Sequence, residues 1–141
     1  MNTNKILMGG IAGAVAFFLL GWLVYGMLLM DFMTANTNQC AMKPMADMTW
    51  WAIILSNLIS ALLLAMIFSW SNISGMAAGA KTAAIIGLMM SLSHAFSSYA
   101  MSTMYNDMTT MLVLAVAHTV IYTIAGAVIA WVMGMSKAKA A

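Results

Sequence analysis

Two histidines offer the clearest chemistry in this sequence. His94 and His118 each lie inside a long apolar stretch, roughly 14–17 Å deep if those stretches are membrane-spanning helices with a rise of about 1.5 Å per residue. A tight link joins the two stretches, so we expect antiparallel neighbours with both imidazoles at the same depth. Such a pair can bind haem b from both faces, hold a metal with methionine, or relay a proton. We favour a simpler interpretation without cofactor, in which each neutral imidazole is hydrogen-bonded to a nearby Ser, Thr or Tyr.

Other polar side chains are predicted at a similar depth in the apolar stretches. Polar and ionisable groups inside a membrane are costly and usually face the bundle interior, so we expect these residues to join the histidines in one intramembrane cluster. No carboxylate lies in any of the stretches, which argues against a proton relay. The predicted cluster consists of Asn57, Ser60, Ser91, Ser98 and Tyr122.

Sulfur is the second candidate chemistry, because the chain has 18 methionines. Thioethers and thiolates prefer Cu(I), and several sulfur residues recur near one predicted end of the bundle. The alternative is that methionine serves as an adaptable packing residue in place of leucine. The candidate copper ligands are Cys40, Met42, Met45 and Met48 in one connection, and Met101, Met104, Met108 and Met111 around another.

Small residues recur at every fourth position of one apolar stretch, and a shorter series occurs near the N-terminus. Residues four apart share a helix face, and small side chains allow transmembrane helices to approach closely. We expect the helix with the longer series to be the centre of the bundle and to pack against the first span. The longer series is Gly75, Gly79, Ala83, Gly87, Ser91 and Ala95, and the shorter is Gly9 and Gly13.

The composition places the chain in a membrane. Of 141 residues, 65% are hydrophobic and 6% are charged, whereas soluble domains carry about 25% charged residues. The net charge of +2 is too small to indicate a nucleic-acid partner. A single cysteine, Cys40, excludes an internal disulfide and a cysteine-based zinc site.

Four apolar runs are long enough to cross a bilayer core of about 30 Å. The first could instead be a signal peptide, but its apolar run is longer than the roughly 7–15 residues of a signal-peptide core. We therefore predict an all-α polytopic membrane protein, an antiparallel four-helix bundle forming one domain over residues 1–141. The predicted spans are 6–30, 50–70, 77–105 and 108–133, and the outer connection is 31–49.

Charged residues divide between the two predicted sides of the membrane. Lysine-rich sides are cytoplasmic in membrane proteins, so this division predicts that both termini are cytoplasmic. The termini side carries Lys5, Lys81, Lys137 and Lys139, and the outer side carries Lys43 with Asp31, Asp47 and Asp107.

Two segments resemble a known group of proteins. Gly21-Trp22-Leu23-Val24-Tyr25 ends the first span, and Ala117-His118 leads to Gly126-Ala127-Val128-Ile129-Ala130-Trp131 in the fourth. This pairing is similar to that of small bacterial four-span proteins of domain-of-unknown-function family 1761. The resemblance implies a four-helix protein of a bacterial inner membrane with no established activity.

The absence of a catalytic motif in the sequence favours an accessory role. We predict a non-catalytic integral membrane subunit, in contact with the lipid bilayer, that assists or assembles a larger membrane complex or a homo-oligomer. The alternatives are a haem- or copper-binding protein that uses the sites above, and a small oligomeric transporter with a path lined by the polar cluster.

Overall fold

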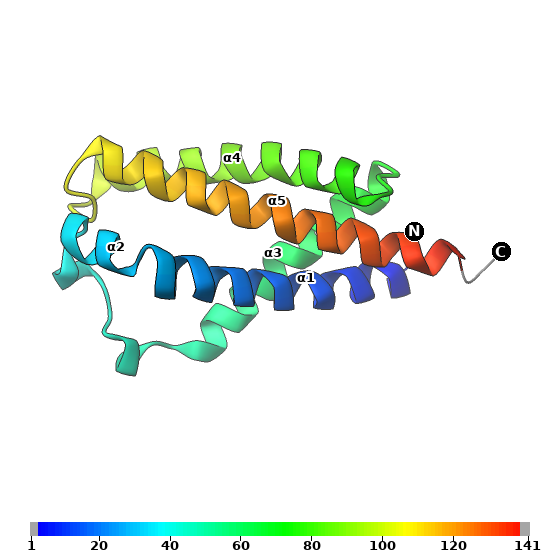
Figure 1. Cartoon of the computed structure of the whole chain (residues 1–141), viewed down its shortest axis with the longest axis horizontal. Helices are drawn as coiled ribbons and strands as arrows, with labels where there is room; N and C mark the ends of the chain where they lie inside the picture. Colours follow the sequence, from blue (N-terminus) through cyan, green and yellow to red (C-terminus); the bar gives the residue numbers. More distant parts are fainter. Residues whose placement is uncertain (1–2, 139–141) are drawn as a thin grey trace.

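Four helices long and apolar enough to cross a membrane run back and forth through the molecule (Figure 1). The computed structural model describes residues 3–138, so Lys139 lies outside the described residues. The described chain has no strand, and its one β-bridge is isolated. The predicted all-α four-helix bundle is thus confirmed. The long helices are α1 (Thr3–Leu23) with its continuation η1 (Val24–Leu28), α3 (Trp50–Trp70), α4 (Met76–Met101) and α5 (Met108–Ala138).

The first span was predicted to run to residue 30, but it does not continue that far as one α-helix. It changes at Val24 to the π-helical turn η1, and the backbone N–H of Leu29 donates to the carbonyl of Val24 at 2.8 Å. Leu29 then leaves helical geometry with φ −108° and ψ 5°, and the short helix α2 (Met30–Asn36) begins. The wider turn therefore ends the span early and redirects the chain.

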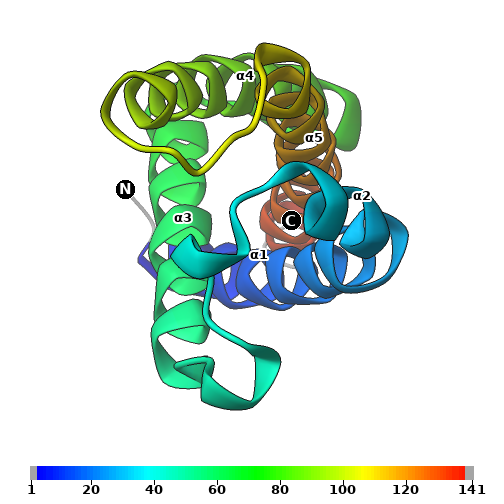
Figure 2. The ribbon, with the colours of Figure 1, turned by 90° about the vertical axis from the view of Figure 1, so that its left-hand side faces the viewer.

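The predicted outer connection 31–49 is more ordered than a plain loop. It contains α2 and two 3-10 turns, η2 (Gln39–Ala41) and η3 (Met45–Asp47). It is also tied to the link between α4 and α5, because the N–H of Asn38 donates to the carbonyl of Met104 at 2.9 Å. These contacts join the two connections at the end of the bundle opposite the chain termini, which we call the outer end and which faces the viewer in Figure 2.

The ends of the last two spans also differ from the predictions. The third span was predicted to reach Tyr105, but α4 ends at Met101, because Tyr105 forms an antiparallel bridge with Thr37 instead of continuing the helix. The fourth was predicted to end at residue 133, but α5 continues to Ala138. Its predicted start is confirmed, since the Asp107 carboxylate accepts a 2.6 Å hydrogen bond from the backbone N–H of Thr110.

Helix α5, not α4, is the centre of the bundle. It lies along α4, crosses α1 and contacts α3, whereas α4 packs chiefly on α5. Both small-residue series face α5 and do not face each other. A Cβ atom at Gly79 would lie 2.7 Å from the carbonyl oxygen of Gly126, and one at Gly9 would lie 2.7 Å from Cγ of Met133. The prediction that α4 packs on the first span was wrong, because α5 lies against both helices: it meets α4 with Gly126 and Ala130, and the first span with Ile129 and Met133.

One member of the longer series does not pack at all. Gly75 precedes α4 with φ +92°, and a Cβ atom there would meet nothing within 4 Å. A positive φ is a conformation that glycine adopts without strain. Gly75 therefore forms the turn between α3 and α4, while Gly79, Ala83, Gly87, Ser91 and Ala95 are the buried residues of α4.

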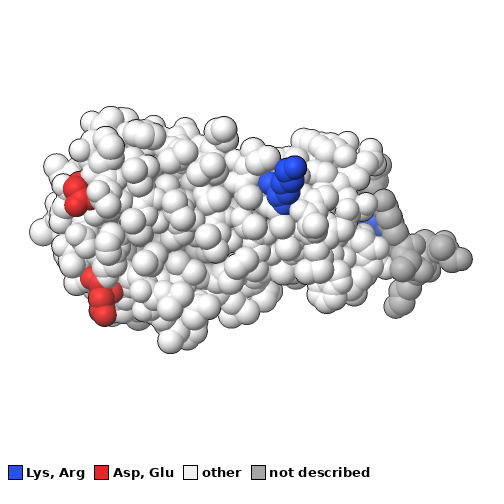
Figure 3. Space-filling model, turned by 45° about the horizontal axis from the view of Figure 1, so that its top comes forward, with Lys and Arg blue, Asp and Glu red and all other residues white. Residues whose placement is uncertain are grey.

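The two ends of the molecule differ in charge. N- and C-terminal ends of the chain lie together in Figure 1, and acidic side chains gather at the opposite end in Figure 3. That end carries Asp31 in α2, Asp47 in η3 and Asp107 before α5. The helices thus separate three carboxylates from Lys5 at the start of α1.

Candidate functional site

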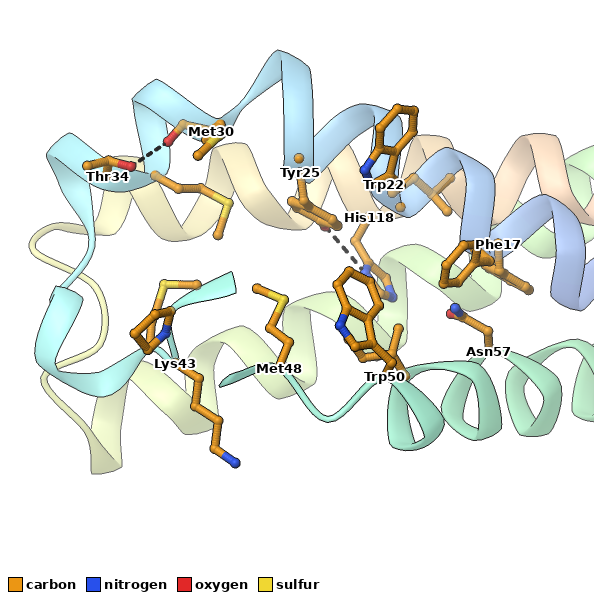
Figure 4. Close-up of a pocket in the computed structure, with 18 of the residues that line it drawn as sticks. Phe17, Trp22, Tyr25, Met30, Thr34, Lys43, Met48, Trp50, Asn57 and His118 are labelled. Atoms are coloured by element: carbon orange, nitrogen blue, oxygen red, sulfur yellow. Dashed lines mark hydrogen bonds between the residues drawn. The ribbon is translucent and has the colours of Figure 1, made fainter. Parts of the chain in front are cut away.

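A cavity of about 530 Å³ lies between the outer half of the first span, the outer connection and the start of α3 (Figure 4). We call it the outer pocket. Small-molecule sites typically measure about 300–1,000 Å³, so the cavity is large enough for a ligand. Its lining residues are Phe17, Phe18, Gly21, Trp22, Tyr25, Gly26, Met30, Met33, Thr34, Gln39, Met42, Lys43, Pro44, Met48, Trp50, Ile53, Asn57, His118 and Ile121.

The π-turn η1 shapes the wall of the outer pocket. It carries Tyr25 and Gly26, which both line the cavity. Gly21, one turn earlier, also lines it, and a Cβ atom there would meet nothing within 4 Å. Single π turns in helices are frequent at functional sites. Here the turn places a phenol beside α5 and two glycines keep the wall thin.

His118 lies at the inner end of the outer pocket. Its Nδ1 atom is 3.5 Å from the hydroxyl of Tyr25, which also donates to the carbonyl of Leu114 at 3.4 Å. The imidazole packs on Tyr122, with ring centroids 4.9 Å apart, and Tyr122 in turn meets the edge of Phe17 at 4.8 Å. This aromatic group fixes the ring plane while leaving one imidazole edge toward the cavity.

His94 is not part of this site. It is exposed, and Nε2 is 3.4 Å from the hydroxyl of Ser98 on its own helix. The α4–α5 register also places the two histidines at different depths. Gly87 lies opposite Tyr122, and the hydroxyl of Ser91 is 3.3 Å from the carbonyl of Ala115, so His118 is level with Ser91. The two imidazoles are therefore offset by about one helical turn and have separate partners, contrary to the predicted shared depth.

The other members of the predicted polar cluster are dispersed. Asn57 joins His118 in lining the outer pocket, and it also borders an adjoining, more open cavity of about 460 Å³. Ser91 is buried between α4 and α5, where its hydroxyl donates to the Ala115 carbonyl. Ser60 and Ser98 are half-buried and do not line either cavity. The structure thus brings together Asn57, His118 and the Tyr25 hydroxyl.

The predicted sulfur ligands do not form the two expected groups. Met42 and Met48 line the outer pocket, Cys40 is exposed, and the side chain of Met45 is outside the described ones. Around the second connection, Met101 is 87% exposed whereas Met111 is fully buried in the core. Met104 is half-buried and Met108 is exposed at the start of α5. Within the part of the chain that the structure describes, no three His, Cys, Asp or Glu residues form a metal-binding group.

Several lining residues were not singled out from the sequence. Tyr25 and Trp22 were quoted only for the family resemblance, and Met30 and Met33 were not among the candidate sulfur ligands. Polar aromatic residues beside Gly21 and Gly26 in an otherwise aliphatic span were the available signal. The outer connection folds back, which sequence spacing does not show, so Met42 and Met48 line the same cavity as Tyr25 and Trp22.

At the outer end, burial shifts the pKa of Tyr105 and helix capping shifts the pKa of Asp107. Burial raises the pKa of the Tyr105 phenol above its ordinary value, which keeps it neutral beside the bridge to Thr37. The hydrogen bonds from Thr110 lower the pKa of the Asp107 carboxyl, so it stays ionised as the cap of α5. Among the described residues that line the outer pocket, only Lys43 carries a formal charge, and it is exposed at the outer rim.

No family model matches the chain, and neither a curated protein nor a solved structure matches it. The resemblance to domain-of-unknown-function family 1761 therefore stays a prediction. The fold and the geometry above define the class of protein: a helical bundle with four helices long and apolar enough to cross a membrane.

Proposed function

We propose that this protein is a non-catalytic accessory or assembly subunit of a larger membrane complex, and that α4 docks against a transmembrane helix of a partner. The carrying observation is a polar flank on the outer half of α4. It consists of Ser93, His94 and Ser97, all exposed. Residues three and four apart lie on one side of a helix, so the three side chains form one stripe along α4.

Contact with lipid would leave the side chains of this polar flank without hydrogen-bond partners. Hydrocarbon tails offer no hydrogen-bond partners, and among the described residues neither Ser93 nor Ser97 has a side-chain hydrogen bond. His94 has only the long contact to Ser98. Transmembrane helices associate through Ser and His side chains that bond across the interface. A partner helix would satisfy these groups, whereas the apolar side chains elsewhere on the bundle already suit lipid.

Photocrosslinking in native membranes tests the interface directly. A benzophenone amino acid at Ser93 is compared with one at Val116, which is 59% exposed on α5 and is level with Ser93 in the α4–α5 register. We expect a discrete product with one larger membrane protein from position 93 and none from position 116. A product made only of two copies of the 15.1 kDa chain, or equal crosslinking from both positions, would refute the proposal.

We further propose a bacterial inner-membrane location with both termini cytoplasmic. The distribution of lysines and aspartates along the helices supports this orientation. Cys40 is the single cysteine and is exposed in the outer connection. A membrane-impermeant maleimide added to spheroplasts should label it, while a Cys40→Ser, Ser74→Cys variant should be labelled only after the membrane is permeabilised. The opposite labelling pattern would reverse the orientation.

A further inference from the structure

The outer pocket has a composition that specifies a kind of ligand. Its walls include aromatic rings and thioethers, among them Phe17, Trp22, Trp50, Met30 and Met48 (Figure 4). Aromatic faces stack on planar rings, and methionine sulfur makes favourable contacts with ring edges. Such walls suit a flat conjugated molecule better than a saturated chain.

The inner end of the outer pocket offers hydrogen bonds without charge. Asn57 and His118 both border it, and among the described residues the Asn57 amide has no hydrogen-bond partner. The Tyr25 hydroxyl is only loosely held, with contacts of 3.4 and 3.5 Å. Polar groups in an apolar site are costly when unpaired. A carbonyl or hydroxyl on the ligand would pair with them, and a neutral ligand fits because Lys43, the one formally charged residue among the described lining residues, is exposed at the outer rim.

The shape of the outer pocket is built by the backbone. Protein interiors are close-packed, yet Gly21 faces open space, and the π turn η1 contributes Tyr25 and Gly26 to the same wall. The volume of about 530 Å³ is many times that of one water molecule, about 30 Å³, and likewise suits a molecule better than a single metal ion.

We propose that the outer pocket binds a neutral, membrane-soluble ring molecule of the quinone class, with a ring oxygen held by Asn57 and His118 and the ring between the aromatic and methionine side chains. This site is separate from the polar flank of α4 and does not depend on it. Binding alone is inferred, with no electron transfer.

Titration of the purified full chain in detergent with decylubiquinone tests the site, because a bound quinone quenches the fluorescence of adjacent Trp22 and Trp50. We expect saturable quenching and an increase in Tm. Gly21→Leu fills the cavity and should weaken binding by at least about tenfold, whereas Asn57→Leu and His118→Phe each remove one hydrogen bond and should weaken it by roughly fivefold.

Gly134→Leu is the matched control. Gly134 is also a helical glycine at which a Cβ atom would meet nothing, but it does not line the outer pocket. The Gly134→Leu variant should bind decylubiquinone as the unsubstituted protein does. Both leucine variants should retain their thermal unfolding transition. The proposal would be overturned by quenching that does not saturate, or by quenching that is equal in Gly21→Leu and the unsubstituted protein. It would also be overturned if palmitate displaced the quinone in a manner that requires Lys43, because that result would indicate an anionic single-chain amphiphile as the ligand.

Discussion

The half of the bundle near the chain termini, which we call the inner half, and the opposite, outer half use glycine in opposite ways. In the inner half, a Cβ atom at Gly126 would overlap that of Ala83 and lie 2.9 Å from the carbonyl oxygen of Gly79, so two backbones are in contact. In the outer half, Gly21 faces the open space of the outer pocket. The same residue type therefore closes a helix interface at one end and keeps a cavity open at the other. We therefore expect substitutions at the close helix contact of the inner half to cost more stability than substitutions beside the cavity of the outer half.

The largest difference between the two halves is expected when leucine replaces Gly126 in the inner half and Gly21 in the outer half. Gly126→Leu forces α4 and α5 apart and should cost about 3 kcal/mol of unfolding free energy, since overpacking a close interface is destabilising. Gly21→Leu should be neutral or gain up to about 1 kcal/mol, because leucine favours the helix. Unfolding by SDS in mixed micelles measures both. Equal stability of the two variants would contradict the division between the halves.

A matched pair of phenylalanines tests the inner core. Phe68 is fully buried against the Gly79 region, whereas Phe96 on α4 is 51% exposed. Phe68→Ala should destabilise the protein by roughly 3 kcal/mol through lost contacts and a residual cavity. Phe96→Ala should stay within about 0.5 kcal/mol. The same SDS titration reports both values, and a large cost at Phe96 would show that the outer part of α4 is also tightly packed.

Removal of the Tyr25 hydroxyl tests how much its contacts in the outer half contribute to stability. Its contacts to His118 and Leu114 are long, so Tyr25→Phe should cost less than about 1 kcal/mol of stability. Circular dichroism during thermal unfolding in detergent gives the change. A loss much greater than that would mean that Tyr25 holds the first span to α5 and that the outer half is not permissive.

The smallest effect is expected at the cap of α5 and depends on pH. The pKa of Asp107 is lowered by the hydrogen bonds from Thr110, so its contribution to stability is complete above the ordinary aspartate pKa of about 3.9. It is lost as the pH falls through the lowered pKa of the folded protein. Asp107→Ala should remove this part of the acid sensitivity in a pH series of thermal unfolding, and Asp31→Asn should retain it.

Much of the fold could be predicted from composition and run length. The span Trp50–Trp70 was predicted at its observed bounds, and the fourth span was predicted at its observed start, Met108. The predicted ends were wrong where the chain makes non-local contacts. Tyr105 leaves its helix to pair with Thr37, and the first span ends in a π turn that no periodicity indicates.

The candidate site was predicted only in part. Asn57 and His118 were selected because polar groups in apolar runs are few, and both line the outer pocket. Tyr25 and Trp22 were missed as site residues, since aromatic residues near a span end are common at membrane interfaces. His94 was paired with His118 by counting residues from the helix ends, and the actual register shifts it by one turn.

By itself the sequence determined that the chain forms four long apolar helices, because so few charged residues cannot cover a water-facing surface and lipid requires each segment to satisfy its own backbone. The tertiary structure alone decided which helix lies at the centre and which polar groups meet. Small residues permit close packing on any partner with a complementary face, and α5 offers such faces to both α1 and α4. The outer pocket arises from that choice, combined with a local π turn and a folded-back connection that bring distant residues to one place.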